Sequence, residues 1–483
     1  VAAQFERLTR GRAPLLDRIV RYTSGPLILV VVLGGVAFHV QRRNAERDGL
    51  SKLAGASANA PNLLLIIWDT VRASNLSLFG YVRPTTPVLE RLAKQSVVFE
   101  NAIASAPWTL PSHASFLTGA LPHQLEADWT SPLDRKTRTL AEFLRQHGYD
   151  TAGFVGNTYY CSEESGLNRG FIHYEDFKRT SFTQLITGSA LIRAVYAHDG
   201  IRHALHLDEE PGRKNAQEIN RDVLGWLRSN RGHPFFAFVN YFDAHAPYLP
   251  PAPFDTRFGA KRPGRNPLIS EERAMSREEL RTEIDQYDGA IAYLDHSLGQ
   301  LLDSLDARGI LDNTIVVVAA DHGEQFGEHG LISHGNSLYL PLLHVPLLIR
   351  APKLAPAGQR VPQWVSLRDV PATLAELASP ANRGAFPGRS LARFWDGSPQ
   401  GRPDTLLTEV SQSSGLPARY PVSRGDMRSV IAAPNQFIAN SNGTEEFYDL
   451  EADKVETHNL IRSVGPALVN EFRAVLREAQ VWN

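Results

Sequence analysis

The sequence contains a single cysteine, Cys161, and only two methionines among its 483 residues. One cysteine excludes an internal disulfide and any zinc site built from cysteines. Neither sign of charge is in excess, because 50 basic and 52 acidic residues give a net charge of −2. Nucleic-acid-binding surfaces normally show a basic excess, so we expect no nucleic-acid partner. The sequence also lacks internal repeats and low-complexity tracts, which leaves an ordinary globular protein.

The chain is too long for one ordinary domain. Its 43% hydrophobic and 21% charged residues are enough to bury a large core. We therefore predict one large α/β domain and a smaller partner. The expected organisation is an N-terminal segment at 1–50, a linker at 51–61, a catalytic α/β domain at 62–355 and an α+β subdomain at 356–483.

Residues 22–41 contain no Lys, Arg, Asp or Glu, and residues 27–38 are nearly all apolar. About 20 residues span a bilayer as a helix, so we predict an N-terminal transmembrane helix that anchors the chain in a membrane. The catalytic domain is then expected outside the cytoplasm, in the periplasm or at the cell surface. Two alternatives stay open: a signal segment cleaved near residues 56–58 (ASA), and a buried helix of a soluble protein.

Apolar runs of strand length recur along residues 62–355, and most end in polar residues. They are continuous rather than alternating, which indicates strands covered on both faces, as in a parallel sheet. We predict these strands at residues 63–68, 152–155, 235–239, 315–320 and 347–349. Helical patterns lie between them, at residues 86–96, 217–228 and 284–305. This alternation predicts a doubly wound, mostly parallel α/β sheet.

The remaining segments are less regular. Residues 250–281 are rich in charge and proline, which predicts a long surface excursion. Asn442-Gly443 predicts a hairpin turn, and residues 466–480 have a helical pattern. We therefore expect an α+β arrangement at the end of the chain.

Three of the predicted strands deliver polar side chains at their carboxyl ends, where open α/β sheets bind ligands. Strand by strand, these side chains are Asp69, Asp243 with His245, and Asp321 with His322. A single Asp after a strand is commonplace and usually structural. Three such strand ends in one chain predict a shared functional site.

A hydroxyl group can join this site from residues 106–119, APWTLPSHASFLTG. Pro111 suits the first position of a helix and Gly119 the position after its end, so we predict a short helix at 111–118. Thr109 would immediately precede it, beside unpaired backbone N–H groups and the positive end of the helix dipole. Such a place stabilises an alkoxide or binds an oxyanion. The alternative is a threonine that only caps a helix.

Two carboxylates, one imidazole and one hydroxyl make a four-ligand site for one divalent metal ion. The predicted ligands are Asp69, Thr109, Asp321 and His322. The mixture of oxygen and nitrogen favours Zn²⁺ or Mn²⁺, with Ca²⁺ or Mg²⁺ as less favoured possibilities. As a ligand, the Thr109 hydroxyl would have a lowered pKa and become a nucleophile.

Several motifs resemble, in order, those of the sulfatase family of the alkaline-phosphatase superfamily. The resemblance extends from Pro61 to about Leu460. It is carried by residues 61–69 (PNLLLIIWD), 109–119 (TLPSHASFLTG), 148–152 (GYDTA), 321–324 (DHGE), 327–330 (GEHG), 344–348 (HVPLL) and 447–450 (FYDL). It implies an α/β sheet domain, a C-terminal antiparallel subdomain and one divalent cation beside the nucleophile.

The sequence also departs from that family. Thr109 stands where sulfatases carry a Cys or Ser matured to formylglycine, and His113 stands where they carry Arg. Threonine cannot become that aldehyde, so water or another acceptor must attack the bound group, which suits phosphoryl better than sulfuryl chemistry. Thr70 replaces the second Asp of an Asp-Asp pair, and Asn157 and Tyr159 replace Lys and His. The unmodified Thr is similar to that of the phosphoglycerol and phosphoethanolamine transferases.

These residues suggest a two-step displacement in which Thr109 attacks a phosphate or, less readily, a sulfate ester. His245 would bind the substrate oxyanion or protonate the leaving group. His334 and Asn157 would position the ester, and His113 would orient the nucleophile. The substrate is expected to be a small molecule or an ester of a polysaccharide or lipid.

Three functions are compatible with these residues and motifs. The first is a Thr-dependent hydrolase or transferase of phosphate esters. The second is a sulfatase that works without formylglycine. The third is a non-catalytic binding protein on the same scaffold, against which the retention of all four predicted metal ligands argues.

Overall fold

The computed structural model describes residues 13–56, 60–176, 213–229, 232–260, 275–398 and 404–479. The chain divides into two compact units, Val1–Lys52 and Leu53–Asn483. Several predicted features fall partly outside the described residues. They are the N-terminal segment at 1–50, the linker at 51–61 with the cleavage site near 56–58, the excursion at 250–281, the subdomain at 356–483 and the end of its last helix at residue 480.

The described part of the first unit is mostly one helix, α2 (Ala13–Ser51). The predicted helix at residues 22–41 lies inside it. Within the described residues, however, no helix combines the length and the apolar character that a membrane span requires. The prediction of a transmembrane helix and membrane anchor is therefore not supported. The nearly continuous apolar run, residues 27–38, falls short of the roughly 20 residues that a bilayer needs.

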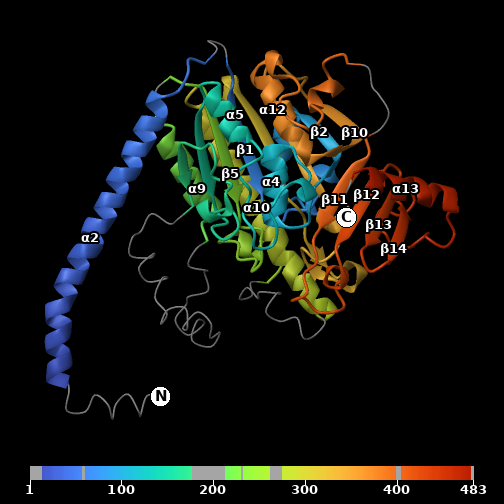
Figure 1. Cartoon of the computed structure of the whole chain (residues 1–483), viewed down its shortest axis with the longest axis horizontal. Helices are drawn as coiled ribbons and strands as arrows, with labels where there is room; N and C mark the ends of the chain where they lie inside the picture. The colour runs from blue at the N-terminus through green and yellow to red at the C-terminus, as the bar shows by residue number, and fades with distance from the viewer. Residues whose placement is uncertain are drawn as a thin grey trace. The chain divides into compact units, whose positions relative to one another are not determined.

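In the second unit, the described residues form a central eight-stranded sheet with the order β10-β2-β9-β6-β1-β5-β3-β4 (Figure 1). Its strands are β1 (Asn62–Trp68), β2 (Val97–Ile103), β3 (Asp150–Val155), β4 (His173–Glu175), β5 (Phe235–Tyr241), β6 (Thr314–Ala319), β9 (His344–Arg350) and β10 (Gln359–Ser366). Strand β9 runs antiparallel to β2 and β6, whereas all other pairings are parallel. The sheet is therefore mixed. The prediction of a mostly parallel sheet needs correction at β9, which runs in the opposite direction.

Burial explains which strands could be predicted. Every residue of β3, β5 and β6 is buried, as expected for strands covered on both faces. The sequence pattern did not reveal β2, because Glu100 and Asn101 interrupt its apolar run. Nor did it reveal β10, an edge strand with patchy burial that contains Pro362, a residue that an edge tolerates. Strand β10 lies beyond residue 355, so the central sheet extends past the predicted domain boundary.

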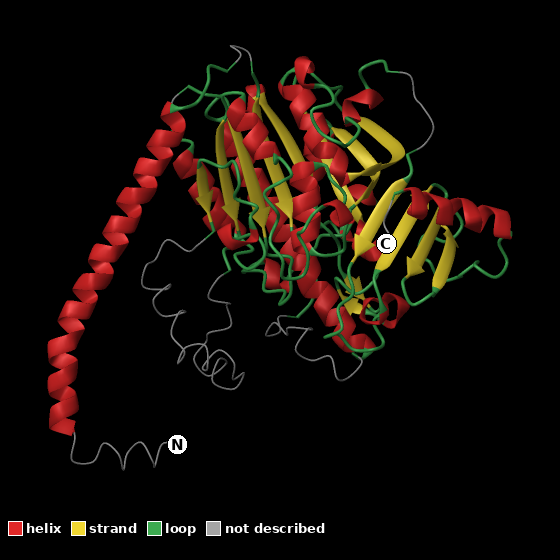
Figure 2. Cartoon of the chain, viewed as in Figure 1, coloured by secondary structure: helices red, strands yellow, loops and turns green. Residues whose placement is uncertain are grey.

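The helices form two packed groups, as a doubly wound sheet requires (Figure 2). One group contains α3 (Pro87–Ala93), α9 (Ala216–Trp226) and α10 (Arg277–Asp306). The other contains α4 (Thr109–Thr118), α5 (Leu140–Gln146) and α12 (Val370–Ala378). A single turn, α11 (Leu340–Leu343), precedes β9, and a small hairpin joins β7 (Gln325–Phe326) to β8 (Ile332–Ser333).

The C-terminal part contains the expected antiparallel sheet. Its strands pair in chain order: β11 (Leu406–Val410), β12 (Met427–Ala432), β13 (Asn435–Asn440) and β14 (Glu445–Asp449). The turn between β13 and β14 holds Asn442-Gly443, with Gly443 at a φ of 90°, so the predicted hairpin is confirmed. Helix α13 (Pro466–Glu478) packs on this sheet through Val469, Phe472 and Leu476.

A carboxylate of α10 replaces the usual cap of α3, and this contact gives a stability prediction. Thr86 precedes α3 without a side-chain capping bond. Instead, the buried Asp295 side chain accepts hydrogen bonds from the backbone N–H groups of Val88 at 2.8 Å and Leu89 at 2.9 Å. We expect Asp295→Ala to lower the free energy of unfolding by about 1–2 kcal/mol, the usual cost of a lost cap. Urea unfolding measures it.

The matched control is Asp303→Ala, because Asp303 lies exposed on the same helix. Its effect should stay within about 0.5 kcal/mol. Equal effects of the two substitutions would contradict the capping role of Asp295.

Candidate active site

The site lies at the carboxyl ends of four neighbouring strands, β6, β1, β5 and β3. The strands run parallel and in register, with Ile67 opposite Ala319 and Trp68 opposite Tyr241. Their ends therefore come together at one edge of the sheet. The residues that follow them are Asp321 and His322 after β6, Asp69 after β1, Asp243 and His245 after β5, and Asn157 after β3.

Asp69 and Asp321 are both fully buried at this edge. One oxygen of Asp69 accepts hydrogen bonds from the side-chain amides of Asn157 at 3.0 Å and Asn240 at 3.3 Å. One oxygen of Asp321 accepts from the backbone N–H groups of Thr70 at 3.2 Å and His322 at 2.9 Å. The second oxygens, Asp69 Oδ1 and Asp321 Oδ2, are buried and have no hydrogen-bond partner among the described residues.

Burial also sets the protonation of this pair. It raises the pKa of Asp69 to about 6, although the amides of Asn157 and Asn240 oppose the shift. Burial and the nearby Asp69 carboxylate raise the pKa of Asp321 well above its usual range. Two buried carboxylates, each with one oxygen that lacks a hydrogen bond, are stabilised by a positive charge between them.

The third member of the group, His322, is held as a neutral imidazole. Its Nδ1 donates to the Gly323 carbonyl at 3.0 Å, which leaves Nε2 as an acceptor with its lone pair toward the Thr109 hydroxyl. Burial lowers the pKa of His322 well below its usual range. A backbone carbonyl that fixes the imidazole in this way is typical of metal-binding histidines.

Thr109 lies beside His322. Its hydroxyl is 3.3 Å from His322 Nε2 and is almost fully buried. Helix α4 begins at Thr109 rather than Pro111, and no side chain caps it. The hydroxyl therefore does not serve as a helix cap, and its observed neighbour is the buried His322.

Two residues of α4 fix this helix to the strand ends. Ser112 donates to the Asp321 carbonyl at 2.6 Å. His113 Nδ1 donates to the Thr109 carbonyl at 2.9 Å, and its Nε2 accepts from the Asn240 amide at 3.4 Å. Burial lowers the pKa of His113 to about 4, so the ring is neutral.

Two further histidines line the other side of the site. The ring centroid of His334 lies 4.7 Å from that of His322 and 5.0 Å from that of His245. His334 Nδ1 pairs with Glu324 at 3.0 Å, whereas its Nε2 is buried without a hydrogen-bond partner in the described chain. Burial alone would lower the pKa of His334, but Glu324 outweighs it and raises that pKa. Burial lowers the pKa of His245 well below its usual range.

The segment that carries His245 is held by Arg213, a residue that no sequence motif singled out. The guanidinium of Arg213 donates to the backbone carbonyls of residues 242, 243, 245 and 247, at 2.6–2.9 Å. It also lies 5.0 Å from the Phe242 ring, on which His245 stacks. Asp243, by contrast, accepts at 3.0 Å from the N–H of Ala216, the first residue of α9, and is not a member of the Asp69, Asp321 and His322 group.

The residues present fit a divalent cation. Single ligand atoms of Asp69, Asp321 and His322 all lie within 4.8 Å of one another. Each carboxylate offers one oxygen without a hydrogen bond, and His322 offers its Nε2 lone pair, which faces the Thr109 hydroxyl. The Thr109 hydroxyl is adjacent to this group. The structure thus brings the four predicted ligands together, with His113, His245, His334 and Asn157 around them.

Comparison with known proteins agrees with this arrangement. The sulfatase family model matches residues 61–380. The chain belongs to the sulfatase family. A choline-sulfatase of Rhizobium meliloti is 27% identical, with 86% of this chain and 85% of the relative covered. An ulvan-active sulfatase of Formosa agariphila is 26% identical, with 86% of this chain and 80% of that relative covered.

Among solved structures, the phosphonate monoester hydrolase of Agrobacterium radiobacter superimposes with a TM-score of 0.66 at 21% identity. The alignment covers 87% of this chain and 95% of the hydrolase. This likeness shows the alkaline-phosphatase-like fold. The family match and the sulfatase relatives together show that the chain is a hydrolase of the sulfatase family.

Two further site residues carry a sequence signal, although the sequence alone assigned them no role. Asn240 follows the apolar run of β5 at 235–239, just as Asp69 follows that of β1, so its position indicates a place at the strand ends. Glu324 lies in the DHGE motif. Arg213 carries no such signal, because its partners are backbone carbonyls of any residue type.

The metal site makes a direct prediction. We expect one divalent ion per chain to bind, and Asp321→Asn to weaken that binding at least about tenfold, because it removes a charged ligand. Metal at a hundred times its Kd should stabilise the protein by about 2.7 kcal/mol. Equilibrium dialysis with Zn²⁺, Mn²⁺, Ca²⁺ or Mg²⁺ and elemental analysis give the affinity.

The control substitution is Asp303→Asn, on the exposed face of α10. It should bind metal as the unmodified chain does. If Asp321→Asn also does so, the ligand assignment is wrong.

Proposed function

We propose that this chain is a metal-dependent hydrolase or transferase of phosphate or sulfate esters that uses Thr109 as its nucleophile. The observation that carries the proposal is the Thr109 hydroxyl, buried 3.3 Å from His322 Nε2 and beside two carboxylates with unpartnered oxygens. Asp69, Asp321 and His322 would hold the cation, with Thr109 as the fourth ligand. When bound, the cation would lower the pKa of the hydroxyl and neutralise charge on the ester.

The remaining residues would divide the work on the ester. His334 Nε2, the unpartnered buried nitrogen, would bind an ester oxygen. Asn157 would hold the Asp69 carboxylate in place through its side-chain amide and would help to position the ester. His113 would fix the start of α4 through the Thr109 carbonyl.

His245 suits a base in the second step. Its Nδ1 donates to the Ala246 carbonyl at 2.6 Å, which leaves Nε2 as an acceptor. It would take a proton from the water or alcohol that attacks the Thr109 ester, since such an ester has no elimination route. A threonine in place of formylglycine favours phosphate and phosphonate esters over sulfate esters.

Substitution of the nucleophile is the main test. With metal at saturating concentration, Thr109→Ala should lower kcat by about 10³-fold or more, because the attacking group is lost, while the circular dichroism spectrum stays unchanged. Initial rates on aryl phosphate, phosphonate, phosphodiester and sulfate esters with added metal measure the loss of kcat and the preference among these ester classes.

The matched control is Thr118→Ala, the same substitution in the same helix. The Thr118 hydroxyl donates to the Ala114 carbonyl, within α4 itself. Thr118→Ala should retain the activity. Full activity of Thr109→Ala would remove the nucleophile from the proposal, and no turnover with any ester would favour a binding protein.

A second substitution tests the support of His245. Arg213→Lys keeps the charge but cannot reach four carbonyls, so His245 should lose its position and kcat should fall by roughly 10²-fold. KM and metal content should change little, because the cation ligands belong to other segments. The control is Arg257→Lys, since the Arg257 guanidinium bonds the backbone carbonyl of Pro84 away from the site. Equal kcat values for both variants would contradict the positioning role.

A further inference from the structure

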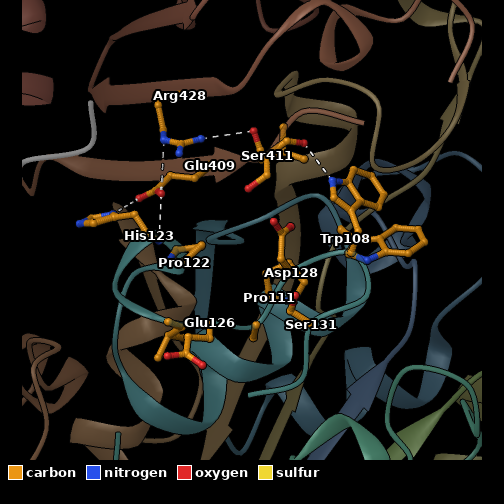
Figure 3. Close-up of a pocket in the computed structure, with 14 residues that line it drawn as sticks. Trp108, Pro111, Pro122, His123, Glu126, Asp128, Ser131, Glu409, Ser411 and Arg428 are labelled. Atoms are coloured by element: carbon orange, nitrogen blue, oxygen red, sulfur yellow. Dashed lines mark hydrogen bonds and ion pairs between the residues drawn. The ribbon is translucent and has the colours of Figure 1, made fainter. Parts of the chain in front are cut away.

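A polar pocket with a volume of about 170 Å³ lies between the start of α4, the loop that follows it and the C-terminal sheet (Figure 3). Trp108 and Pro111 form one wall, and β11 and β12 contribute Glu409 and Arg428. Trp108 immediately precedes Thr109, and its ring centroid is 5.5 Å from that of His334. The pocket therefore adjoins the candidate active site and can hold the part of a substrate that does not react.

Two indole rings provide the apolar surface of the pocket. The ring centroids of Trp108 and Trp129 are 4.6 Å apart. Trp129 Nε1 donates to the Ser411 carbonyl at 2.9 Å, which fixes its orientation. Both rings line the pocket and are held together before any ligand binds.

Most charges around the pocket are already paired. Glu409 contacts His123 Nδ1 at 2.6 Å and lies 3.5 Å from Arg428. Glu126 pairs with Lys136 at 2.8 Å, and its side chain is 62% exposed. Asp128 differs, because its carboxylate has no hydrogen bond or ion pair within the described residues. The carboxylate points into the space between the Glu409 group and the indole rings (Figure 3).

We propose that this pocket binds an organic ammonium group, the amine end of an amino-alcohol ester. Aromatic faces attract such cations, and the Asp128 carboxylate supplies the opposite charge. A sulfated polysaccharide fits this pocket less well, because its sulfate groups would be repelled by Asp128. Arg428 does not offset this repulsion, since Glu409 neutralises its charge. The volume is below the roughly 300–1,000 Å³ typical of whole ligand sites, so the pocket takes one end of a substrate. The link to an ester rests on the proposed function.

The test compares a cation with its neutral carbon isostere. Choline should bind the unmodified protein about tenfold more tightly than 3,3-dimethylbutanol, as measured by calorimetry. Asp128→Asn should reduce this ratio to about twofold or less, and Trp129→Leu should weaken choline binding about tenfold. Glu126→Gln, the same charge change at the paired and exposed rim, should keep the ratio. Equal binding of the two probes, or an unchanged ratio in Asp128→Asn, overturns the proposal.

A kinetic measurement joins the pocket to the active site. The phosphate esters of choline and of 3,3-dimethylbutanol should differ about tenfold in kcat/KM, and Asp128→Asn should remove the difference. Binding of choline that depends on Asp128, without turnover of any ester, would support the pocket and contradict the proposed function. Turnover of both esters at equal kcat/KM would contradict the pocket alone.

Discussion

The structure depends on two buried carboxylates that face each other, Asp69 and Asp321. Each ionised carboxylate taken out of water costs several kcal/mol unless it is compensated. Amide and backbone donors satisfy one oxygen of each carboxylate and leave the other without a hydrogen bond. The pair is therefore stable either with bound protons, which the raised pKa values express, or with a cation. The site therefore strongly favours a positive charge beside Thr109.

The backbone after β1 is strained to make this arrangement. Thr70 has a φ of 61°, which a β-branched residue rarely adopts. The Tyr287 hydroxyl donates to the Thr70 carbonyl at 2.8 Å, and the Thr70 hydroxyl donates to the Ala244 carbonyl at 3.0 Å. In this conformation the Thr70 N–H bonds to Asp321. The strain thus links the ends of three strands, and packing around α10 sustains it.

The sequence predicted what depends on local pattern. Continuous apolar runs marked β1, β3, β5, β6 and β9, because burial on both faces demands them. The direction of β9 was not predictable, since an apolar run is the same in either direction. Contacts that use backbone groups also leave no sequence pattern, which explains why Arg213 was missed. The strand-end rule located Asp69, Asp321 and His322 because parallel strands in register bring their ends together.

The replacement of an Arg by His113 has a consequence for substrate binding. His113 is neutral and its ring nitrogens are engaged by Thr109 and Asn240, so it adds no positive charge. The guanidinium of Arg213 is likewise engaged by carbonyls. Of the four described histidines at the site, His113, His245 and His322 have lowered pKa values, and only the pKa of His334, beside Glu324, is raised. Under the proposed function, an anionic ester group would therefore be bound mainly by the cation. A substrate with few protein contacts at its reacting end would gain affinity from contacts at its other end. The pocket beside Trp108 lies where those contacts would form.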